Sequence, residues 1–574
     1  MNTLVLLIIC IAVLLTGYVL YGGWLCKQWG VGENKEETPA HTLEDGVDYV
    51  PAKAPVLMGH HFSSIAGAGP ITGPISAAMF GWLPVTLWVL VGGIFFGGVH
   101  DFGALFASIR HKGQSIGEII SANMSRRAKR LFIIFSYLTL ILVVAAFASI
   151  VAGTFGASVK DGVIDKAASS ANASVAMVSL LFIVIAIIFG FAVYRRNAPM
   201  LISTIVGVVA IVLCLVIGMN FHPIYLTTNT WMIIVGIYIA IASVTPVWIL
   251  LQPRDYLSSF LLYAMLIIAA FGVIGAHPNI DSASFPAFAG FSVNGQLLFP
   301  ILFTTVACGA ISGFHSLVSS GTTSKQLDKE KDAKPIAYGG MLLECVLAIL
   351  TLCAIAYAKQ WNAANPDSAQ LSGPTGIFAG GISKMVATIP GLAGAENILY
   401  TLLVLAYSAF CLTSLDTATR LARFMFQEFW LEPGQTPKDI KSGYKKILVN
   451  PYFATVLTVV LGILLGLTGW NKIWGLFGAA NQLLAGLGLL AVATWLGNIG
   501  KNNKMFLFPM AFMMVVTICS LLLTVKNQIT AIQAGGADWG PYAQIVLGIL
   551  LIVLAIILVI EGIQTLMGKN KKKA

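Results

Sequence analysis

The stretch that decides the fold is Gly59-His60-His61-Phe62-Ser63-Ser64-Ile65-Ala66-Gly67-Ala68-Gly69-Pro70-Ile71-Thr72-Gly73-Pro74. It lies where the apolar pattern of the chain requires a membrane helix. However, proline lacks the N–H that a helix uses, and glycine is unfavourable inside a helix. Lipid cannot solvate the backbone groups that such an interruption frees, so the break must face protein or a water-filled cavity. The stretch therefore predicts a broken helix at membrane depth, which is typical of a transporter binding site.

The composition indicates a membrane protein. Of the 574 residues, 57% are hydrophobic and only 10% are charged, whereas soluble proteins carry about 25% charged residues. The net charge of +10 does not indicate nucleic-acid binding, because the basic residues lie in short loops between apolar spans. The sequence contains no phosphate-binding loop of the form G-x-x-x-x-G-K-[ST], which argues against ATP-driven transport. The eight cysteines lie mostly in apolar spans without Cys-x-x-Cys spacing, so we expect small buried hydrophobes.

The apolar segments predict an all-α polytopic membrane protein. A transmembrane helix needs about 20 apolar residues, and on this basis we expect about 15 transmembrane helices. The first, at residues 3–25, is expected to be a retained helix rather than a cleaved signal. The basic loop at residues 110–130 is placed in the cytoplasm. Alternation then puts all but six of the 34 Lys and Arg residues in the cytoplasm. The six external residues are Lys160, Lys166, Lys359, Lys384, Lys472 and Lys526. The N-terminus is therefore expected outside and the tail Lys569–Lys573 inside.

A second interruption is predicted at Ser243-Val244-Thr245-Pro246, within the span at 231–252. The two predicted broken helices are five spans apart and run in opposite directions, as in two inverted five-helix repeats whose first helices meet near the midplane. A plain proline kink is the alternative at Pro246. The prediction divides the chain into four parts. They are an extra helix and cytoplasmic loop at 1–59, repeat one at 60–220, repeat two at 221–420, and four additional helices with the basic tail at 421–574.

Few ionisable side chains lie inside the predicted spans, where such groups usually face a cavity or one another. They are His60, His61, His100, Asp101, His315, Glu344 and Asp416. We expect them to line an inner, cytoplasmic vestibule and to serve in proton transfer or gating. The structural alternatives are an ordinary i,i+4 pair between Asp416 and Arg420, a hydrogen-bonded structural role for Glu344, and an indirect role for His100.

The helix interruptions supply the candidate binding groups. The freed N–H groups near Thr72 suit a carboxylate-bearing substrate. Sodium would instead use the carbonyls at 66–69 and nearby hydroxyls. The predicted substrate-binding residues are Ala66, Gly67, Gly69, Thr72, Gly73, Ser243 and Thr245. The predicted ion-coupling or gating residues are His60, His61, Ser63, Ser64, Asp101, Ser312, His315 and Glu344. The choice between proton and sodium stays open, and no other cofactor is expected.

Two other classes of function are considered. One is a metal-binding intramembrane sensor or enzyme that uses His60, His61, His100, Asp101 and His315. The other is a channel, which the paired helix breaks disfavour. Gradient-driven transport remains the leading hypothesis, and the protein is not expected to be an enzyme.

Three stretches resemble the carbon starvation protein A (CstA) family of bacterial inner-membrane transporters. They are residues 59–74, residues 97–103 with Arg110-His111-Lys112-Gly113, and residues 308–324, and the stretch Thr245–Tyr256 also fits. The resemblance implies an amino acid–polyamine–organocation (APC-type, LeuT-like) fold of inverted repeats. It also implies uptake of peptides or pyruvate during nutrient limitation. It transfers no binding residue, and it leaves the oligomeric state open.

Overall fold

The computed structural model describes residues 1–568 except 34–36, 47, 197, 369, 433–434, 436 and 536–538. The predicted cytoplasmic tail Lys569–Lys573 lies outside the described residues. The rest of the chain is helical apart from loops and two short hairpins, which confirms the predicted all-α class.

Helices α1 to α13 precede residue 277. They are α1 (Thr3–Thr16), α2 (Gly22–Trp29), α3 (Pro39–Thr42), α4 (Ala54–Ala66), α5 (Gly69–Ala77), α6 (Trp82–Gly92), α7 (Gly98–Arg110), α8 (Ile116–Asn123), α9 (Arg126–Phe155), α10 (Ser170–Gly190), α11 (Met200–Asn220), α12 (Thr228–Val244) and α13 (Leu251–Ala276). Wide π-type turns join α1 to α2 and α6 to α7, so each of these pairs forms one continuous rod.

The remaining helices follow a hairpin at residues 292–297. They are α14 (Leu298–Thr305), α15 (Gly313–Gly321), α16 (Gly339–Ala364), α17 (Gly373–Thr375), α18 (Gly381–Ala387), α19 (Glu396–Trp430), α20 (Tyr444–Leu448), α21 (Pro451–Gly466), α22 (Trp470–Asn498), α23 (Lys504–Gln533) and α24 (Trp539–Leu566). The antiparallel hairpins are β1 (Val159–Lys160) with β2 (Val163–Ile164), and β3 (Ser292–Val293) with β4 (Gln296–Leu297).

Many of these helices are suited to a bilayer. In the described residues, 11 helices are long and apolar enough to cross a membrane, and α12 and α21 are shorter apolar helices. Two further crossings are interrupted, α4–α5 and α14–α15. The apolar side chains on the outer helices are exposed, as expected for surfaces that face lipid rather than water.

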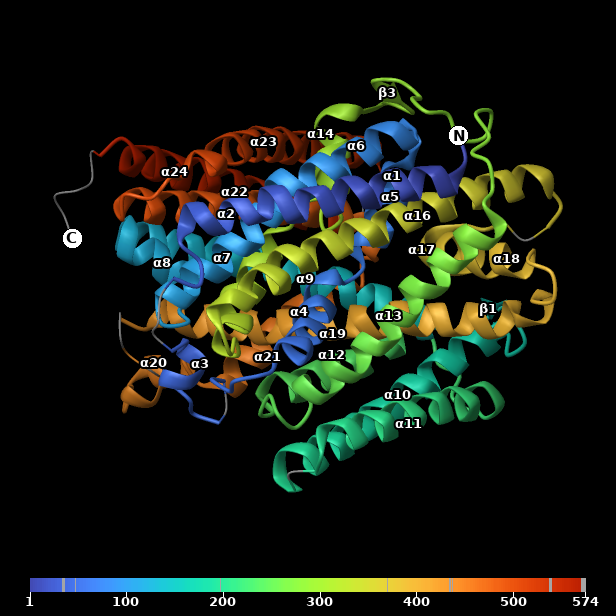
Figure 1. The fold of residues 1–574 in the computed structure, drawn as a ribbon, viewed down its shortest axis with the longest axis horizontal. Coiled ribbons are helices and arrows are strands. Elements are labelled where there is room, and N and C mark those ends of the chain that lie inside the picture. Colours follow the sequence, from blue (N-terminus) through green and yellow to red (C-terminus); the bar gives the residue numbers. More distant parts are fainter. Residues whose placement is uncertain are drawn as a thin grey trace.

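The bundle has two ends, which we name after one residue at each. At the Asn2 end, the backbone N–H of Thr3 donates to the carbonyl of Pro278, which follows α13 (3.0 Å). At the Asn123 end, the side chain of Asn498 at the end of α22 donates to Asn123 Oδ1 (3.2 Å). In Figure 1 the N-terminus marks the Asn2 end on the right, and α8 lies near the Asn123 end on the left.

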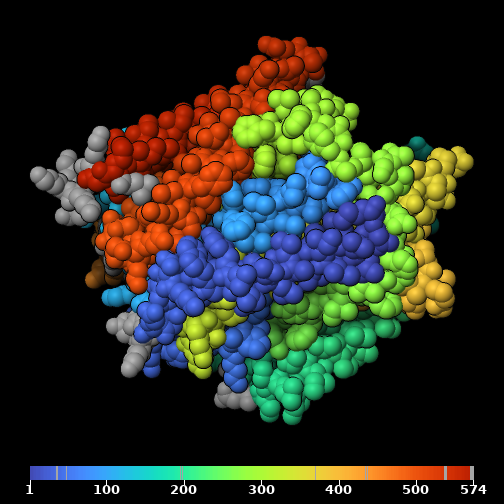
Figure 2. Space-filling model, turned by 45° about the horizontal axis from the view of Figure 1, so that its top comes forward, coloured from blue at the N-terminus to red at the C-terminus, as the bar shows by residue number. Residues whose placement is uncertain are grey.

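Long helices at the centre carry the core. α9 packs along α19. α22 packs on both α9 and α15, and its most apolar stretch is completely buried. α10 and α11 form a pair at one edge of the bundle (Figure 1). Figure 2 shows α1 and α2, in dark blue, lying across the surface beside α6 and α7.

The structure confirms the first predicted interruption and corrects the second. α4 ends at Ala66 and α5 begins at Gly69. The predicted break at Thr245-Pro246 is wrong, because α12 ends at Val244 and a separate 26-residue helix, α13, begins at Leu251. Pro246 marks the turn between two crossings, since proline ends a helix as readily as it bends one. The second interrupted helix is α14–α15, with residues 306–312 between its halves.

Candidate functional site

The first interruption depends on one glycine in an unusual conformation. Gly67 has φ +45° and ψ −154°, outside the range that residues with a side chain adopt readily. A Cβ atom there would lie 2.8 Å from the Phe147 ring and 3.1 Å from Ser414 Oγ. Ser414 in turn donates to the carbonyl of Ser64 (3.0 Å), one of the groups that the break leaves without a helical partner. The site thus joins α4 to both central helices, α9 and α19.

The second interruption is held by side chains from elsewhere in the chain. Asn481 in α22 accepts the backbone N–H of Phe314 (2.8 Å) and donates to Ser312 Oγ (3.0 Å). Trp88 Nε1 and Gln482 Nε2 donate to the carbonyl of Val306, at 3.2 and 3.5 Å. These bonds supply partners for backbone groups that lipid would leave unsatisfied.

The two interruptions touch one another. A Cβ on Gly69 would lie 2.4 Å from Cys308 Sγ, and a Cβ on Gly73 would lie 2.8 Å from the carbonyl of Thr305. Both contacts are closer than real Cβ atoms make, so glycine is required for this approach of α5 to the second break. The two interrupted helices therefore meet inside the bundle, as the sequence predicted for its two broken helices, but with α14–α15 as the partner.

The predicted substrate-binding residues divide into two groups. Ala66, Gly67, Gly69, Thr72 and Gly73 lie at or beside the first interruption, where Thr72 Oγ1 meets the Tyr407 hydroxyl (3.2 Å). Ser243 and Thr245 do not join them. Ser243 bonds to Thr455 in α21 (3.3 Å), and Thr245 donates to the carbonyl of Ile241 (2.8 Å) in its own helix.

A buried cluster of histidines and carboxylates lies beside the second break, and we call it the Asp101 cluster. Asp101 in α7 binds His100 Nδ1 (2.8 Å) through one oxygen and His315 Nδ1 (2.7 Å) through the other. The other ring nitrogen of His315 lies 3.6 Å from Glu344 Oε2 in α16. Asp101, His315 and Glu344 are all fully buried. The structure thus brings together these three predicted coupling residues, and His100 contacts Asp101 as expected.

The charged form of Glu344 has little to stabilise it. Within the described residues, neither carboxylate oxygen of Glu344 has a hydrogen-bond partner, and neither does His315 Nε2. Burying a charge without hydrogen bonds is costly. A proton shared along His315 and Glu344 relieves that cost, so this pair is suited to take up and release a proton.

A second buried ionic group, the Arg254 cluster, lies between α4, α12, α13 and α19. The guanidinium of Arg254 contacts the carboxylates of both Asp255 (2.9 Å) and Asp416. Tyr238 donates to Asp416 Oδ2 (2.8 Å) and accepts from Arg254 (2.6 Å). Asp255 also binds His60 Nδ1 (2.9 Å). Arg254 is only 1% exposed, so both carboxylates depend on it for charge compensation.

This cluster corrects the expected pairing of Asp416 with Arg420. Asp416 faces Arg254, whereas Arg420 donates to the backbone carbonyls of Ala242 and Thr245 at the end of α12. Those carbonyls lack helical partners because α12 stops at Val244. Arg420 is therefore used to cap a helix end.

The remaining predicted coupling residues are buried and mostly engaged. His61 Nδ1 meets Thr323 Oγ1 (2.8 Å), and Ser63 donates to the carbonyl of Asp255 (3.3 Å). Ser312 bonds to Asn481, whereas the hydroxyl of Ser64 has no partner among the described residues. In the described part of the chain, no group of three or more His, Cys, Asp or Glu side chains is arranged to hold a metal. The eight cysteines are free thiols, and six of them are buried.

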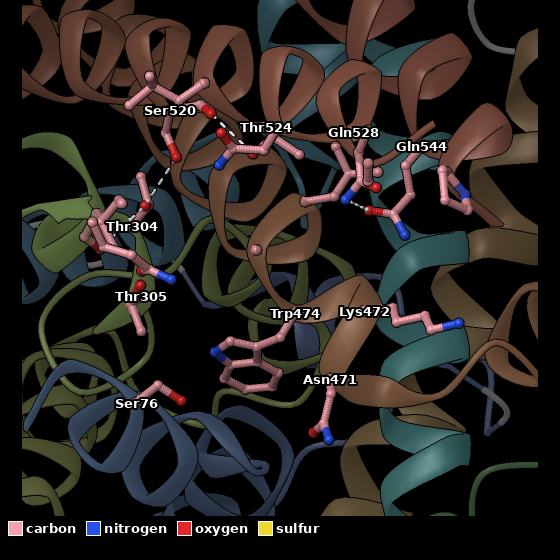
Figure 3. Close-up of a pocket in the computed structure, with 18 of the residues that line it drawn as sticks. Ser76, Thr304, Thr305, Asn471, Lys472, Trp474, Ser520, Thr524, Gln528 and Gln544 are labelled. Atoms are coloured by element: carbon pink, nitrogen blue, oxygen red, sulfur yellow. Dashed lines mark hydrogen bonds between the residues drawn. The ribbon is translucent and has the colours of Figure 1, made fainter. Parts of the chain in front are cut away.

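A cavity of about 600 Å³ lies on the other side of the interruptions, toward the Asn2 end (Figure 3). It reaches Ser76 near the end of α5 and Thr305 at the end of α14. Its other walls are the first residues of α22, the second half of α23 and the start of α24. We call it the outer vestibule, after the orientation predicted from the sequence.

Sequence reasoning missed three parts of this site. The sequence indicates Arg254 and Asp255 only through the family resemblance, because a charged pair next to Pro253 is typical of a loop at a helix end. Tyr238 gave no signal in an apolar span. Asn481 and Gln482 lie in α22, far along the chain from the break that they stabilise. The only sequence signal for a polar role is that these two amides are adjacent within an apolar segment.

Comparisons with known proteins agree with this architecture. The model of the family "Carbon starvation protein CstA" matches residues 2–371 and 360–520. The peptide transporter CstA of Bacillus subtilis is 31% identical over 98% of this chain and 97% of its own length. The peptide transporter CstA of Escherichia coli is 31% identical over 90% of this chain and 80% of its own length. The pyruvate/proton symporter BtsT of Escherichia coli is 30% identical, over 85% of this chain and 76% of its own length.

Solved structures show the same fold at low sequence identity. A crystal structure of the manganese transporter of Eremococcus coleocola matches with a TM-score of 0.50 and 13% identity. It covers 92% of this chain and 99% of that transporter. This likeness bears on the fold alone. The family match and the relatives show that the chain belongs to the carbon starvation protein CstA family of multi-pass membrane transporters and is not an enzyme.

Proposed function

We propose that this protein is a secondary active transporter that imports small carboxylate-bearing nutrients, peptides or pyruvate, across the bacterial inner membrane. Protons drive the import through the Asp101 cluster. The observation that carries the proposal is the buried chain Asp101–His315–Glu344, which lies beside the second helix interruption and ends on a carboxylate that has no hydrogen-bond donor among the described residues.

The geometry favours protons over sodium. A sodium site at the interruptions would use the hydroxyls of Ser63, Ser64 and Ser312. One of these oxygens, Ser312 Oγ, already accepts a hydrogen bond from Asn481 (3.0 Å). The Asp101 cluster instead consists of groups that gain and lose protons. The relative BtsT is named a pyruvate/proton symporter, which is consistent with this choice.

The packing supports an inverted repeat with revised boundaries. We infer 15 crossings: the 11 long helices, the two shorter ones and the two interrupted ones. α12 and α21 both pack on α9 and α19. α13 packs on α4 and α19, as α22 packs on α15 and α9. These matches pair the elements of the two repeats in chain order. The first repeat is α4–α5, α6–α7, α9, α12 and α13, and the second is α14–α15, α16, α19, α21 and α22. The second repeat then begins at α14 rather than at residue 221, and α10–α11 is an insertion in the first.

The Arg254 cluster is suited to act as the inner gate. It ties α4 and α13 to α19 near the Asn123 end, which the distribution of basic residues places in the cytoplasm. The outer vestibule lies toward the opposite end. Alternating access requires that one side close while the other opens. Separation of Asp416 from Arg254 would free α19 from α13 and help the inner side to open.

Uptake into proteoliposomes tests this function. Labelled pyruvate and labelled trialanine are offered under an inward proton gradient, an inward sodium gradient, or neither. We expect accumulation only with the proton gradient, and Asp101→Asn or Glu344→Gln should abolish accumulation while exchange of labelled for unlabelled substrate continues. Asp328→Asn, a partly exposed carboxylate at His41, is the matched control and should accumulate normally. Failure of both gradients to drive either solute would overturn the proposal.

A further inference from the structure

The outer vestibule has a chemical character that the coupling machinery does not explain. Its described lining contains no carboxylate and one charged side chain, Lys472. Amides and hydroxyls make up the polar part of the wall. The amides are Gln296, Asn471, Asn527, Gln528 and Gln544. A route for protons or simple ions does not need such a collection of neutral groups that each donate and accept hydrogen bonds.

Two pairs of polar side chains hold this wall in place. Gln528 Nε2 donates to Gln544 Oε1 (3.0 Å), and Thr304 and Ser520 share a hydrogen bond (3.1 Å). Figure 3 shows both pairs at the rim of the cavity. Each glutamine uses only part of its capacity, so Gln544 keeps its N–H donors and Gln528 keeps its carbonyl oxygen for a ligand.

Trp474 supplies the strongest indication of a ligand. Its side chain lines the vestibule and is only 6% exposed, and its indole N–H has no hydrogen-bond partner among the described residues. In Figure 3 the indole nitrogen points toward the side on which Ser76 and Thr305 lie. A buried donor without an acceptor is costly, and a ligand carbonyl or carboxylate would relieve the cost.

We propose that the outer vestibule is a binding site for short peptides of two or three residues, reached before the helix interruptions. This inference rests on the proposed transport function and names its substrate class. A peptide group offers one donor and one acceptor, the pair that primary amides match.

Pyruvate fits the same cavity poorly. It carries acceptors but no hydrogen-bond donor, so the carbonyl oxygens of Gln528 and its neighbours would be left without partners. Sites that lose such hydrogen bonds discriminate strongly against the smaller ligand. Ligand pockets for molecules larger than pyruvate measure about 300–1,000 Å³, and the vestibule of about 600 Å³ lies within that range.

Chemical labelling tests the site without relying on transport. In the variant Thr524→Cys, the new thiol lies in the vestibule wall and should react with a membrane-impermeant maleimide, with the wild-type protein as the background. We expect trialanine to slow this reaction and pyruvate to leave it unchanged at equal concentration. Equal protection by both solutes, or protection by neither, would overturn the peptide assignment while leaving gradient-driven uptake to be judged by its own assay.

Calorimetric titration of the purified protein with trialanine provides a second measurement that needs no introduced cysteine. Trp474→Phe keeps an aromatic ring and removes the N–H, so we expect affinity for trialanine to fall by about five- to tenfold, as for one lost hydrogen bond. The matched control is Trp231→Phe in α12, away from the vestibule, which removes another buried indole N–H that has no partner in the described part of the chain. Unchanged affinity in Trp474→Phe, or an equal loss in Trp231→Phe, would contradict the proposal.

Discussion

The two sides of the helix interruptions differ sharply in their chemistry. Toward the Asn123 end, the side chains are charged and buried, with Arg254 serving two carboxylates and His315 lying between two more. Toward the Asn2 end, the outer vestibule is hollow and largely neutral. On the functions proposed above, the difference assigns closing and coupling to ionic groups on one side, and substrate recognition to amides on the other.

Among the substitutions that test this comparison, removal of Arg254 should have the largest effect on stability and uptake. Arg254→Ala leaves His60 as the partner of Asp255 and the Tyr238 hydroxyl as the partner of Asp416. Breaking a buried ion pair by removing one partner costs about 3–5 kcal/mol in known cases. We expect a large drop in the thermal denaturation temperature of the detergent-purified protein and no uptake. Arg127→Ala removes an exposed arginine with a partner, Glu561, and should change neither. A stable and active Arg254→Ala variant would show that the charged side is not held by this cluster.

The contact between the two interruptions can be broken and restored. Gly69→Ala places a methyl group against Cys308, where its Cβ would lie 2.4 Å from Sγ. We expect a loss of about 1–3 kcal/mol in the free energy of unfolding, as for overpacking, together with reduced uptake. Adding Cys308→Gly makes room and should restore most of both. If the double variant is as impaired as the sum of its single changes, the two breaks are not packed against each other.

The amide that holds the second break should have a smaller effect. Asn481→Ala removes the acceptor of the Phe314 N–H and the partner of Ser312, and we expect a loss of about 1–2 kcal/mol in stability. Asn498→Ala, an exposed amide at the end of the same helix, should have no measurable effect on thermal denaturation. Equal stability of the two variants would argue against a structural role for Asn481.

The smallest effect is expected at the turn that was predicted to be the second break. Thr245→Val removes a hydroxyl that bonds only to its own helix at Ile241. Its stability should change by less than about 0.5 kcal/mol, and its uptake should match the wild type. A severe loss of uptake in this variant would restore residues 243–246 to the binding site.

The sequence predicted the parts of the fold that depend on local chemistry. The broken helix at Gly67 follows from glycine and proline, which weaken a helix, and the apolar segments predicted an all-α membrane protein, in which 11 described helices are long and apolar enough to cross a membrane. Asp101, His315 and Glu344 were found because ionisable groups are rare in apolar spans. The sequence predicted that these residues line one vestibule, but it did not predict which of them are in contact.

The second interruption was misplaced because its cause is not local. Pro246 gave a strong signal but only ends α12. The break at residues 306–312 contains no proline and is held open by Asn481, Gln482 and Trp88 from other helices. In the same way, the partner of Asp416 proved to be Arg254 at a distance in sequence, and not Arg420 one helical turn away. Pairings between distant helices need the fold before they can be identified.

The central claim is that buried carboxylate and histidine groups couple protons to substrate entry. The most direct test adds trialanine to proteoliposomes and records the external pH together with the uptake of labelled peptide. The account predicts that peptide entry makes the weakly buffered external medium more alkaline, and that Glu344→Gln abolishes this change while peptide exchange continues. Peptide entry by the wild-type protein without any movement of protons would contradict it.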